Sequence, residues 1–250
     1  MPTSNDDAKL DVTILGSSDA FCSGGHPHAT YLVETRRATF LVDCGPTVLL
    51  ALKQRDVDTA SIDFVVISHL HGDHFGGVPF LVLDGQFRRR TRDLTVIGPP
   101  STRSRLDQVM EAMFPGSSTA PRRFAVHVAE HVDGRAVELA SLRVTPFEVR
   151  HASGAPAYAL RVDGPSGSLA YSGDTEWTDG LLDAARDVDL FLCEGYSPAP
   201  IRWHLDLTTL SNHRDRFTCR QLVLTHLSPT ALASDLANWQ VAYDGVQFDL

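Results

Sequence analysis

The sequence has few cysteines, no long apolar run and no excess of positive charge, and each absence excludes a class of protein. Its four cysteines, Cys22, Cys44, Cys193 and Cys219, are scattered without a C-x-x-C pair. Neither a disulfide framework nor a zinc knuckle is therefore indicated, and we expect reduced thiols. No run approaches the roughly 18 apolar residues of a membrane-spanning helix. The polar, acidic start, residues 1–11, has no signal-peptide pattern, so we expect a cytoplasmic protein.

The net charge of −9 argues against a broad electrostatic contact with nucleic acid. With 43% hydrophobic and 21% charged residues, the chain of 250 residues has the composition of an ordinary globular protein. Arg88–Arg90 and Arg92 form a short basic run beside Asp84 and Asp93. Such a short run favours a solvated helix end over a nucleic-acid site.

The most informative stretch runs from Phe64 to His74. Its first four residues are apolar without alternation, which predicts a strand buried on both faces. Three histidines and a carboxylate come directly after the strand, namely His69, His71, Asp73 and His74. Side chains of these types share one small volume only if metal ions offset their crowding and desolvation. The stretch therefore predicts a metal site, and a histidine-rich polar loop is the disfavoured alternative.

Three further polar residues are placed after strand-like runs in the same way. His151, Asp174 and His226 each come directly after or within two residues of such a run. Repeated placement at strand ends favours a common site for these residues and the first four.

The other histidines show no such placement. His127, His131 and His213 match no strand end and are expected to be solvated. His26 and His28 lie in a loop with glycines and a proline, where they either line a substrate entrance or are solvated. Loop mobility favours the solvated interpretation.

Runs with strand character alternate with helix signals along the whole chain. The expected helices cover residues 46–55, 78–83, 101–113, 181–186, 208–214 and 229–236. The expected strands cover residues 10–15, 30–34, 39–43, 64–67, 94–98, 124–128, 142–149, 158–162, 168–172, 189–193, 221–225 and 241–248, the last closing the sheet. We expect one domain, residues 1–250, made of two βα halves, roughly 1–116 and 117–250.

His69-Leu70-His71-Gly72-Asp73-His74 resembles the H-x-H-x-D-H signature of the metallo-β-lactamase superfamily of metal-dependent hydrolases. Ile14–Gly16, Phe40–Gly45 and Ser172–Thr175 resemble the ribonuclease Z and arylsulfatase-like branch, and the similarity extends from about Val12 to Leu250. The resemblance implies an α/β fold, a four-layer αβ/βα sandwich with two mixed β-sheets flanked by helices. It also implies two divalent metal ions, Zn²⁺ first and Mn²⁺ or Fe²⁺ as alternatives. One ion would be held by His69, His71 and His151, the other by Asp73, His74 and His226, with Asp174 bridging.

Such a site would hold a hydroxide between two metals, so the resemblance implies a hydrolase. Asp73 is also predicted to be a catalytic residue, in addition to being a metal ligand. Glu194 and His204 resemble the carboxylate and histidine that protonate the leaving group in ribonuclease Z-like enzymes, although Cys193 and Leu205-Asp206 depart from the residues usual there. The alternative role for Glu194 is a carboxylate that orients a ligand or caps a helix.

The spacing of the later ligands bears on the substrate. Asp174 lies 174 − 151 = 23 residues after His151, enough for two strands and a turn. This leaves no room for the flexible arm that resembling tRNA maturation enzymes carry there. A small-molecule phosphodiester is therefore the expected substrate, with an ester, lactone or sulfate ester as the alternative and ribonuclease Z-like RNA cleavage as the second. A non-enzymatic metal-binding sensor is disfavoured because no ligand position is missing. We expect neither nucleic-acid nor membrane partners, and we leave a homodimer open.

Overall fold

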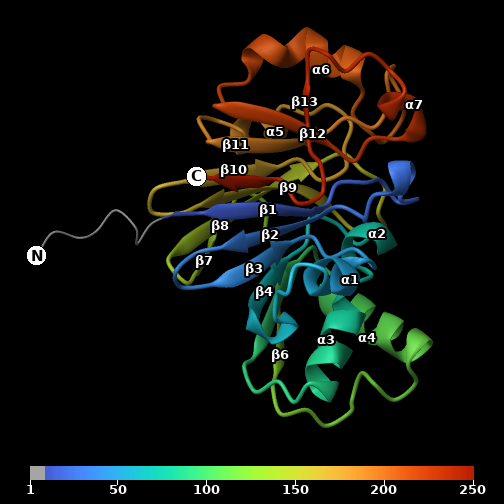
Figure 1. The fold of residues 1–250 in the computed structure, drawn as a ribbon, viewed down its shortest axis with the longest axis vertical. Helices are drawn as coiled ribbons and strands as arrows, with labels where there is room; N and C mark the ends of the chain where they lie inside the picture. Colours follow the sequence, from blue (N-terminus) through green and yellow to red (C-terminus); the bar gives the residue numbers. More distant parts are fainter. Residues whose placement is uncertain (1–8) are drawn as a thin grey trace, which may run out of the picture.

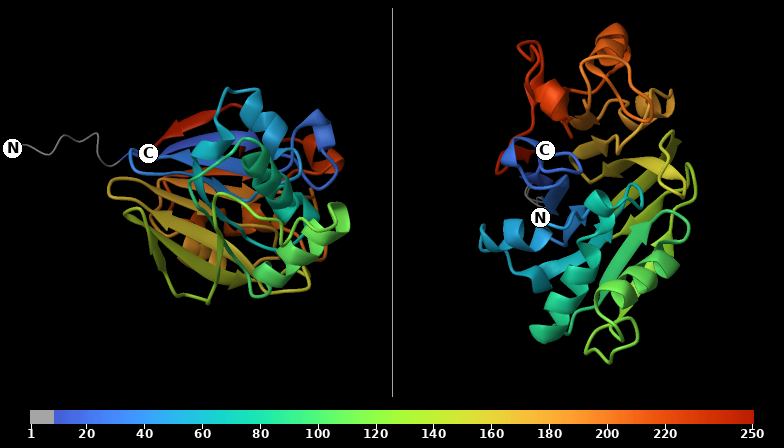
Figure 2. Two further views of the ribbon diagram at one scale, coloured as in Figure 1. Left: turned by 90° about the horizontal axis from the view of Figure 1, so that it is seen from below. Right: turned by 90° about the vertical axis from the view of Figure 1, so that its right-hand side faces the viewer.

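The computed structural model describes residues 9–250, which fold into four layers (Figure 1). Two mixed β-sheets of seven strands each face one another in the middle. Helices from the first half of the chain cover one outer face, and helices from the second half cover the other (Figure 1 and Figure 2). This is the αβ/βα sandwich that the resemblance to the metallo-β-lactamase superfamily implied.

The first sheet has the strand order β14-β1-β2-β3-β4-β5-β6. Its strands are β14 (Gln247–Asp249), β1 (Asp11–Gly16), β2 (Thr30–Glu34), β3 (Thr39–Val42), β4 (Ile62–Val66), β5 (Leu94–Gly98) and β6 (Val126–Glu130). The helices that accompany it are α1 (Val48–Lys53), α2 (Gly72–Phe75), α3 (Val78–Phe87) and α4 (Thr102–Met113).

The second sheet has the order β13-β12-β11-β10-β9-β8-β7. Its strands are β13 (Gln240–Val241), β12 (Gln221–Thr225), β11 (Leu190–Glu194), β10 (Ser168–Tyr171), β9 (Ala157–Asp163), β8 (Leu142–Val149) and β7 (Val137–Leu139). Its helices are α5 (Gly180–Ala184), α6 (Leu207–His213) and α7 (Pro229–Leu232). The chain passes from the first sheet to the second between Glu130 and Val137.

Strand β4 is buried on both faces, as the sequence predicted. Phe64 and Val66 pack in the core between the sheets, whereas Val65 and Ile67 pack against the helices of the first half. β4 also pairs in parallel with β3 and β5 on its two sides. Each such side chain contributes about 1.5–3 kcal/mol when fully buried, so the residues after β4 are attached to a rigid support.

The last predicted strand, residues 241–248, is wrong as a single element. β13 pairs in parallel with β12 in the second sheet, and β14 pairs antiparallel with β1 in the first. Between them the chain turns at Gly245, whose φ of 90° favours glycine. The Asp-Gly pair at 244–245 is a turn signal that ends one strand and lets the chain cross to the other sheet.

The arginine run after α3 is only partly a solvated helix end. Arg90 is 4% exposed, and its guanidinium donates to the backbone carbonyls of Thr59, Ile62, Arg92 and Asp93. Burial lowers the pKa of this guanidinium. The expectation of a solvated side chain is therefore wrong for Arg90, because backbone carbonyls beside the starts of β4 and β5 need donors and arginine supplies several from one group.

All four cysteines lie in the described part of the chain and are free thiols, as predicted. Among residues 9–250 no helix is both long and apolar enough to cross a lipid bilayer.

Candidate metal centre

The seven predicted ligands meet at one edge of the sandwich, where strands from both sheets end. They form two adjacent groups, and within each group the ligand atoms lie within 4.8 Å of one another. One group is His69, His71 and His151; the other is Asp73, His74, Asp174 and His226. The loop after β4 therefore supplies two members of each group, and strand ends of the second sheet supply the rest.

Asp174 lies between the two groups and directs one carboxylate oxygen toward each. Its Oδ2 is 3.9 Å from Nε2 of both His69 and His151. Its Oδ1 is 3.3 Å from Nε2 of His74 and 3.6 Å from Nδ1 of His226. This is the placement that a carboxylate needs to bridge two cations.

Several atoms of the cluster are buried without a hydrogen-bond partner. They are His69 Nε2, Asp174 Oδ1 and His226 Nδ1. A buried polar atom without a partner costs about 1–3 kcal/mol, so three in one small volume need a compensating ligand. Imidazole nitrogens and carboxylate oxygens are donors for divalent transition metals, and these residues therefore fit a metal site.

The charges of the cluster also favour a metal site. Burial alone would lower the pKa of His74, but Asp174, Asp73 and Asp43 outweigh it and raise that pKa well above its ordinary value. Burial also opposes protonation of His226, yet Asp174 and the hydrogen bond with Asp73 raise its pKa to about 10. The carboxylates thus favour positive charge at this place, which divalent cations would supply.

Asp43, directly after β3, fixes the loop that carries the first ligands. Its Oδ1 accepts a hydrogen bond from the backbone N–H of Ser68 at 2.7 Å, and its Oδ2 accepts from the Ser68 hydroxyl at 2.7 Å. Oδ2 also accepts from Nδ1 of His74 at 2.6 Å, so Nε2 of that ring faces the cluster. Asp43 is not among the residues predicted for the site. The signal that could have found it is an acidic residue directly after a buried strand.

Glu194, at the end of β11, is fully buried and holds His204 in place. Its Oε1 is 2.5 Å from Nδ1 of His204 and 3.3 Å from Nδ1 of His226. Its Oε2 accepts from the backbone N–H groups of Thr175 and Leu205, at 2.9 and 3.0 Å. Glu194 caps no helix; it orients a ring beside the cluster. Burial opposes protonation of His204, but the hydrogen bond and charge of Glu194 raise its pKa above the ordinary value.

The prediction of a solvated side chain is confirmed for His127 and wrong for His131. His127 is exposed and pairs with Asp93 at 2.9 Å. His131 is 2% exposed, and its Nε2 donates to the carbonyl of Ile67 at 3.0 Å. The backbone N–H of His131 donates to the carbonyl of Gly98 at the end of β5. This bond places the ring beside Ile67, at the start of the ligand loop. Burial lowers its pKa to about 4.

The remaining histidines are partly buried and have partners. His213 stacks on Trp177 with ring centroids 3.9 Å apart. Nδ1 of His26 is 2.7 Å from Asp244. His28 lies against Cys22 and Thr47, and burial lowers its pKa. These contacts contradict free solvation, since each ring has a fixed neighbour.

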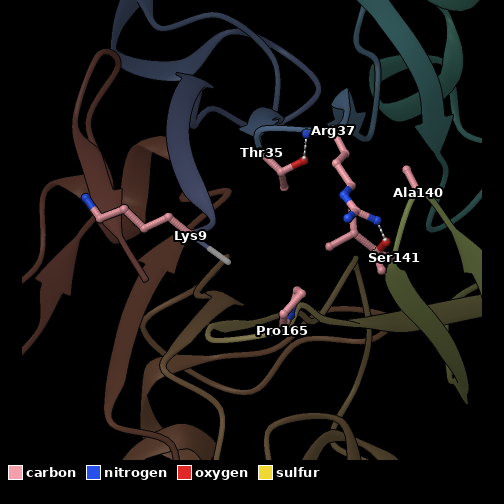
Figure 3. Close-up of a pocket in the computed structure, with 7 residues that line it drawn as sticks. Lys9, Thr35, Arg37, Ala140, Ser141 and Pro165 are labelled. Carbon is pink, nitrogen blue, oxygen red and sulfur yellow. Dashed lines mark hydrogen bonds between the residues drawn. The ribbon is translucent and has the colours of Figure 1, made fainter. Parts of the chain in front are cut away.

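A pocket of about 220 Å³ lies at the opposite end of the strands, among the turns that precede β1, come after β2 and join β7 to β8 and β9 to β10 (Figure 3). Arg37 donates to the hydroxyl of Ser141 across it, at 2.7 Å, while the Lys9 side chain points away. The pocket is lined by Lys9, Thr35, Arg37, Ala140, Ser141, Leu142 and Pro165. These side chains include no histidine, cysteine or carboxylate, so the pocket is separate from the metal centre.

Comparison with known proteins gives one family match. A family model described as "Anti-Pycsar protein Apyc1" matches residues 10–238. Protein Rv1339 of Mycobacterium tuberculosis is 35% identical over 243 residues, which are 94% of this chain and 87% of that protein. A ribonuclease Z of Mycobacterium avium is 26% identical over 257 residues, covering 92% and 90% of the two chains.

Solved structures share the fold at lower identity. The metallo-β-lactamase fold protein YhfI of Bacillus subtilis superposes with a TM-score of 0.79 at 19% identity, covering 97% of this chain and 100% of that one. The short form of human tRNase Z gives 0.75 at 20% identity, with 95% and 98% covered. A diphosphatase from the PhnP family gives 0.75 at 20% identity, with 96% and 98% covered.

Proposed function

Since this chain belongs to the family of the anti-Pycsar protein Apyc1 and has the metallo-β-lactamase fold, we propose that it is a metal-dependent hydrolase of small phosphodiesters. The observation that carries the proposal is Asp174, whose two oxygens face two separate groups of ligands. The names of the relatives support the reaction class, because a ribonuclease and a diphosphatase both cleave bonds between phosphorus and oxygen.

We propose two divalent cations, with Zn²⁺ first and Mn²⁺ or Fe²⁺ as alternatives. His69, His71 and His151 would hold one, Asp73, His74 and His226 the other, and Asp174 would contact both. Bound divalent cations lower the pKa of water to about 7 and polarise a phosphoryl oxygen, which is the chemistry that hydrolysis at neutral pH needs.

The chain itself supplies the proton for the leaving group in this proposal. Glu194 binds Nδ1 of His204 and so leaves Nε2 as the nitrogen available to a departing oxygen. The hydrogen bond and charge of Glu194 raise the pKa of His204 and so favour the protonated ring, which a general acid requires. Asp73 and Asp174 would balance the charge of the cations.

The course of the chain between two ligand residues of the second sheet supports a small substrate. The chain between His151 and Asp174 forms β9 and β10, which pair with each other and are joined by a turn closed by Gly164 and Gly167. This hairpin uses the segment that would otherwise carry an arm for tRNA. With the net charge of −9, this supports a small-molecule partner over nucleic acid.

The test is a substrate panel with the purified protein and added Zn²⁺ or Mn²⁺. The panel contains bis(4-nitrophenyl) phosphate, unsubstituted alkyl and nucleoside phosphodiesters, a phosphomonoester, a lactone, a carboxylic ester, a sulfate ester and a precursor tRNA. We expect turnover of small phosphodiesters and none of the tRNA. Preferred turnover of the lactone, carboxylic ester or sulfate ester would replace the proposed substrate class, and cleavage of the tRNA trailer would overturn the argument from the hairpin.

A further inference from the structure

His151 is held by a backbone carbonyl from a distant part of the chain. Its Nδ1–H donates to the carbonyl oxygen of Trp203 at 2.7 Å. This bond fixes the tautomer, so the lone pair of Nε2 faces the cluster, where Nε2 lies 3.0 Å from Nδ1 of His71. The position of the Trp203 carbonyl therefore determines the tautomer and the ring orientation of His151.

The turn that supplies this carbonyl is strained. Ile201 and His204 pair with each other, so Arg202 and Trp203 are the central residues of a tight turn. Trp203 has a φ of 73°, in the left-handed region that favours glycine and disfavours a bulky side chain. A non-glycine residue keeps such a conformation only when its surroundings hold it there.

Glu176 provides that support. Its Oε1 accepts a hydrogen bond from the backbone N–H of Trp203 at 2.9 Å. Its own backbone is tied to the residue before His151, because the N–H of Glu176 donates to the carbonyl of Arg150 at 3.0 Å. Glu176 also lies two positions after Asp174. One residue thus links the segments that carry His151, Asp174 and His204.

We propose that Glu176 is a positioning residue for the metal centre. Through the N–H of Trp203 it holds the turn in the conformation that aims the Trp203 carbonyl at His151 and places His204 beside Glu194. The proposal rests on the metal centre of the proposed function, but not on the identity of the substrate. What matters is an acceptor oxygen at this position; the exposed ion pair with Arg150, 3.4 Å long, contributes little.

The test is the stepwise affinity of the full chain for Zn²⁺, measured by competition with a chromophoric chelator, together with the absorption spectrum of the Co²⁺-loaded protein. We expect Glu176→Ala to weaken the site with His151 by about 10–100-fold and to change the Co²⁺ spectrum, because the ligand loses its fixed orientation. The affinity of the site with His74 should stay unchanged. Glu176→Gln keeps an acceptor oxygen and should keep most of the affinity.

A second substitution isolates the strained turn. Trp203→Gly retains the carbonyl and adopts positive φ without strain, so this variant should bind Zn²⁺ nearly as the parent does. In its background Glu176→Ala should cost much less affinity than in the parent, because the turn no longer needs the support. A loss of equal size in both backgrounds would overturn the proposal.

Two controls separate charge and fold from positioning. Arg150→Ala removes only the ion pair with Glu176. Asp183→Ala removes an exposed carboxylate of α5 that pairs with Arg186. Both variants should bind Zn²⁺ like the parent. If Arg150→Ala and Glu176→Gln were as damaging as Glu176→Ala, the ion pair would be the cause and the proposal would be wrong. A parent protein that binds Zn²⁺ but cleaves no phosphodiester would refute the proposed function alone, whereas a parent that binds none of Zn²⁺, Mn²⁺ and Fe²⁺ would refute both.

Discussion

Replacing His204 by alanine tests whether the chain supplies its own proton donor. The ring is held on one side by the Glu194 carboxylate, 2.5 Å from Nδ1, and on its face by Tyr196, whose ring centroid is 4.2 Å away. Its side chain is 21% exposed, so Nε2 is accessible to a departing oxygen while the ring stays fixed. A donor placed in this way acts in the transition state more than in substrate binding.

The expected size of the effect depends on the leaving group. An alkoxide is a strong base and leaves only when protonated, whereas a nitrophenolate leaves without help. We expect His204→Ala to lower kcat for an alkyl phosphodiester by about 10²-fold or more, which corresponds to about 2.7 kcal/mol in activation free energy. Turnover of the nitrophenyl analogue should hardly change. Glu194→Gln should show the same selectivity in weaker form, because an amide still positions the ring but does not stabilise its charge.

The assay compares kcat for the two substrates at equal metal loading. His127→Ala is the matched control, because it removes a histidine that is also paired with a carboxylate, Asp93, but lies exposed on β6. Equal losses on both substrates would refute the reasoning and give His204 a binding or structural role. Loss of metal from the variant would mean that His204 is a ligand.

Two further predictions concern the metal count and the pH dependence of stability. The purified protein should carry about two divalent ions per chain by elemental analysis, and Asp174→Asn should lose both, since each oxygen of Asp174 faces one group; one ion per chain with full activity would contradict this. The pKa of His131 is about 4 in the folded chain against an ordinary 6.5, so the unfolded chain takes up a proton first as the pH falls. The stabilising contribution is therefore complete above pH 6.5 and is lost toward pH 4, by about 3 kcal/mol. In urea unfolding of the metal-free protein, His131→Gln, which keeps a donor for the Ile67 carbonyl, should lack this part of the pH dependence, and an identical dependence in both proteins would show that His131 does not cause it.

The ligand loop after β4 could be predicted from sequence because its information is local. An unbroken apolar run marks a strand buried on both faces, and His69, His71, Asp73 and His74 stand at the end of that run, at a spacing visible in the sequence itself. His151, Asp174 and His226 could be grouped with them because each comes after a strand. Their assignment to one ion or the other came from the resemblance, since spacing in the sequence does not fix distances across two sheets.

The residues that were missed depend on contacts between distant segments. His131 is buried because β6 pairs with β5, and Arg90 is buried because backbone carbonyls beside the starts of β4 and β5 need donors. Neither residue has a neighbour in the sequence that indicates this. The strand predicted at 241–248 failed for a different reason, because the apolar residues on both sides of Asp244-Gly245 outweighed the turn signal between them.

The division of the ligands between the sheets has a consequence for stability. The loop after β4 belongs to the first sheet, whereas His151, Asp174 and His226 come after strands β8, β10 and β12 of the second. Neither metal group is complete until the two sheets pack against each other. Cations that bind only the assembled site therefore stabilise the packed state over a state in which the sheets separate, by about 4 kcal/mol when the free metal is about 1,000 times the dissociation constant. Contacts such as the 2.8 Å hydrogen bond between Tyr31 of β2 and Thr225 of β12 already hold the sheets together beside the cluster. Bound cations would thus add stability at the edge where the buried carboxylates and imidazoles of this cluster otherwise oppose closure.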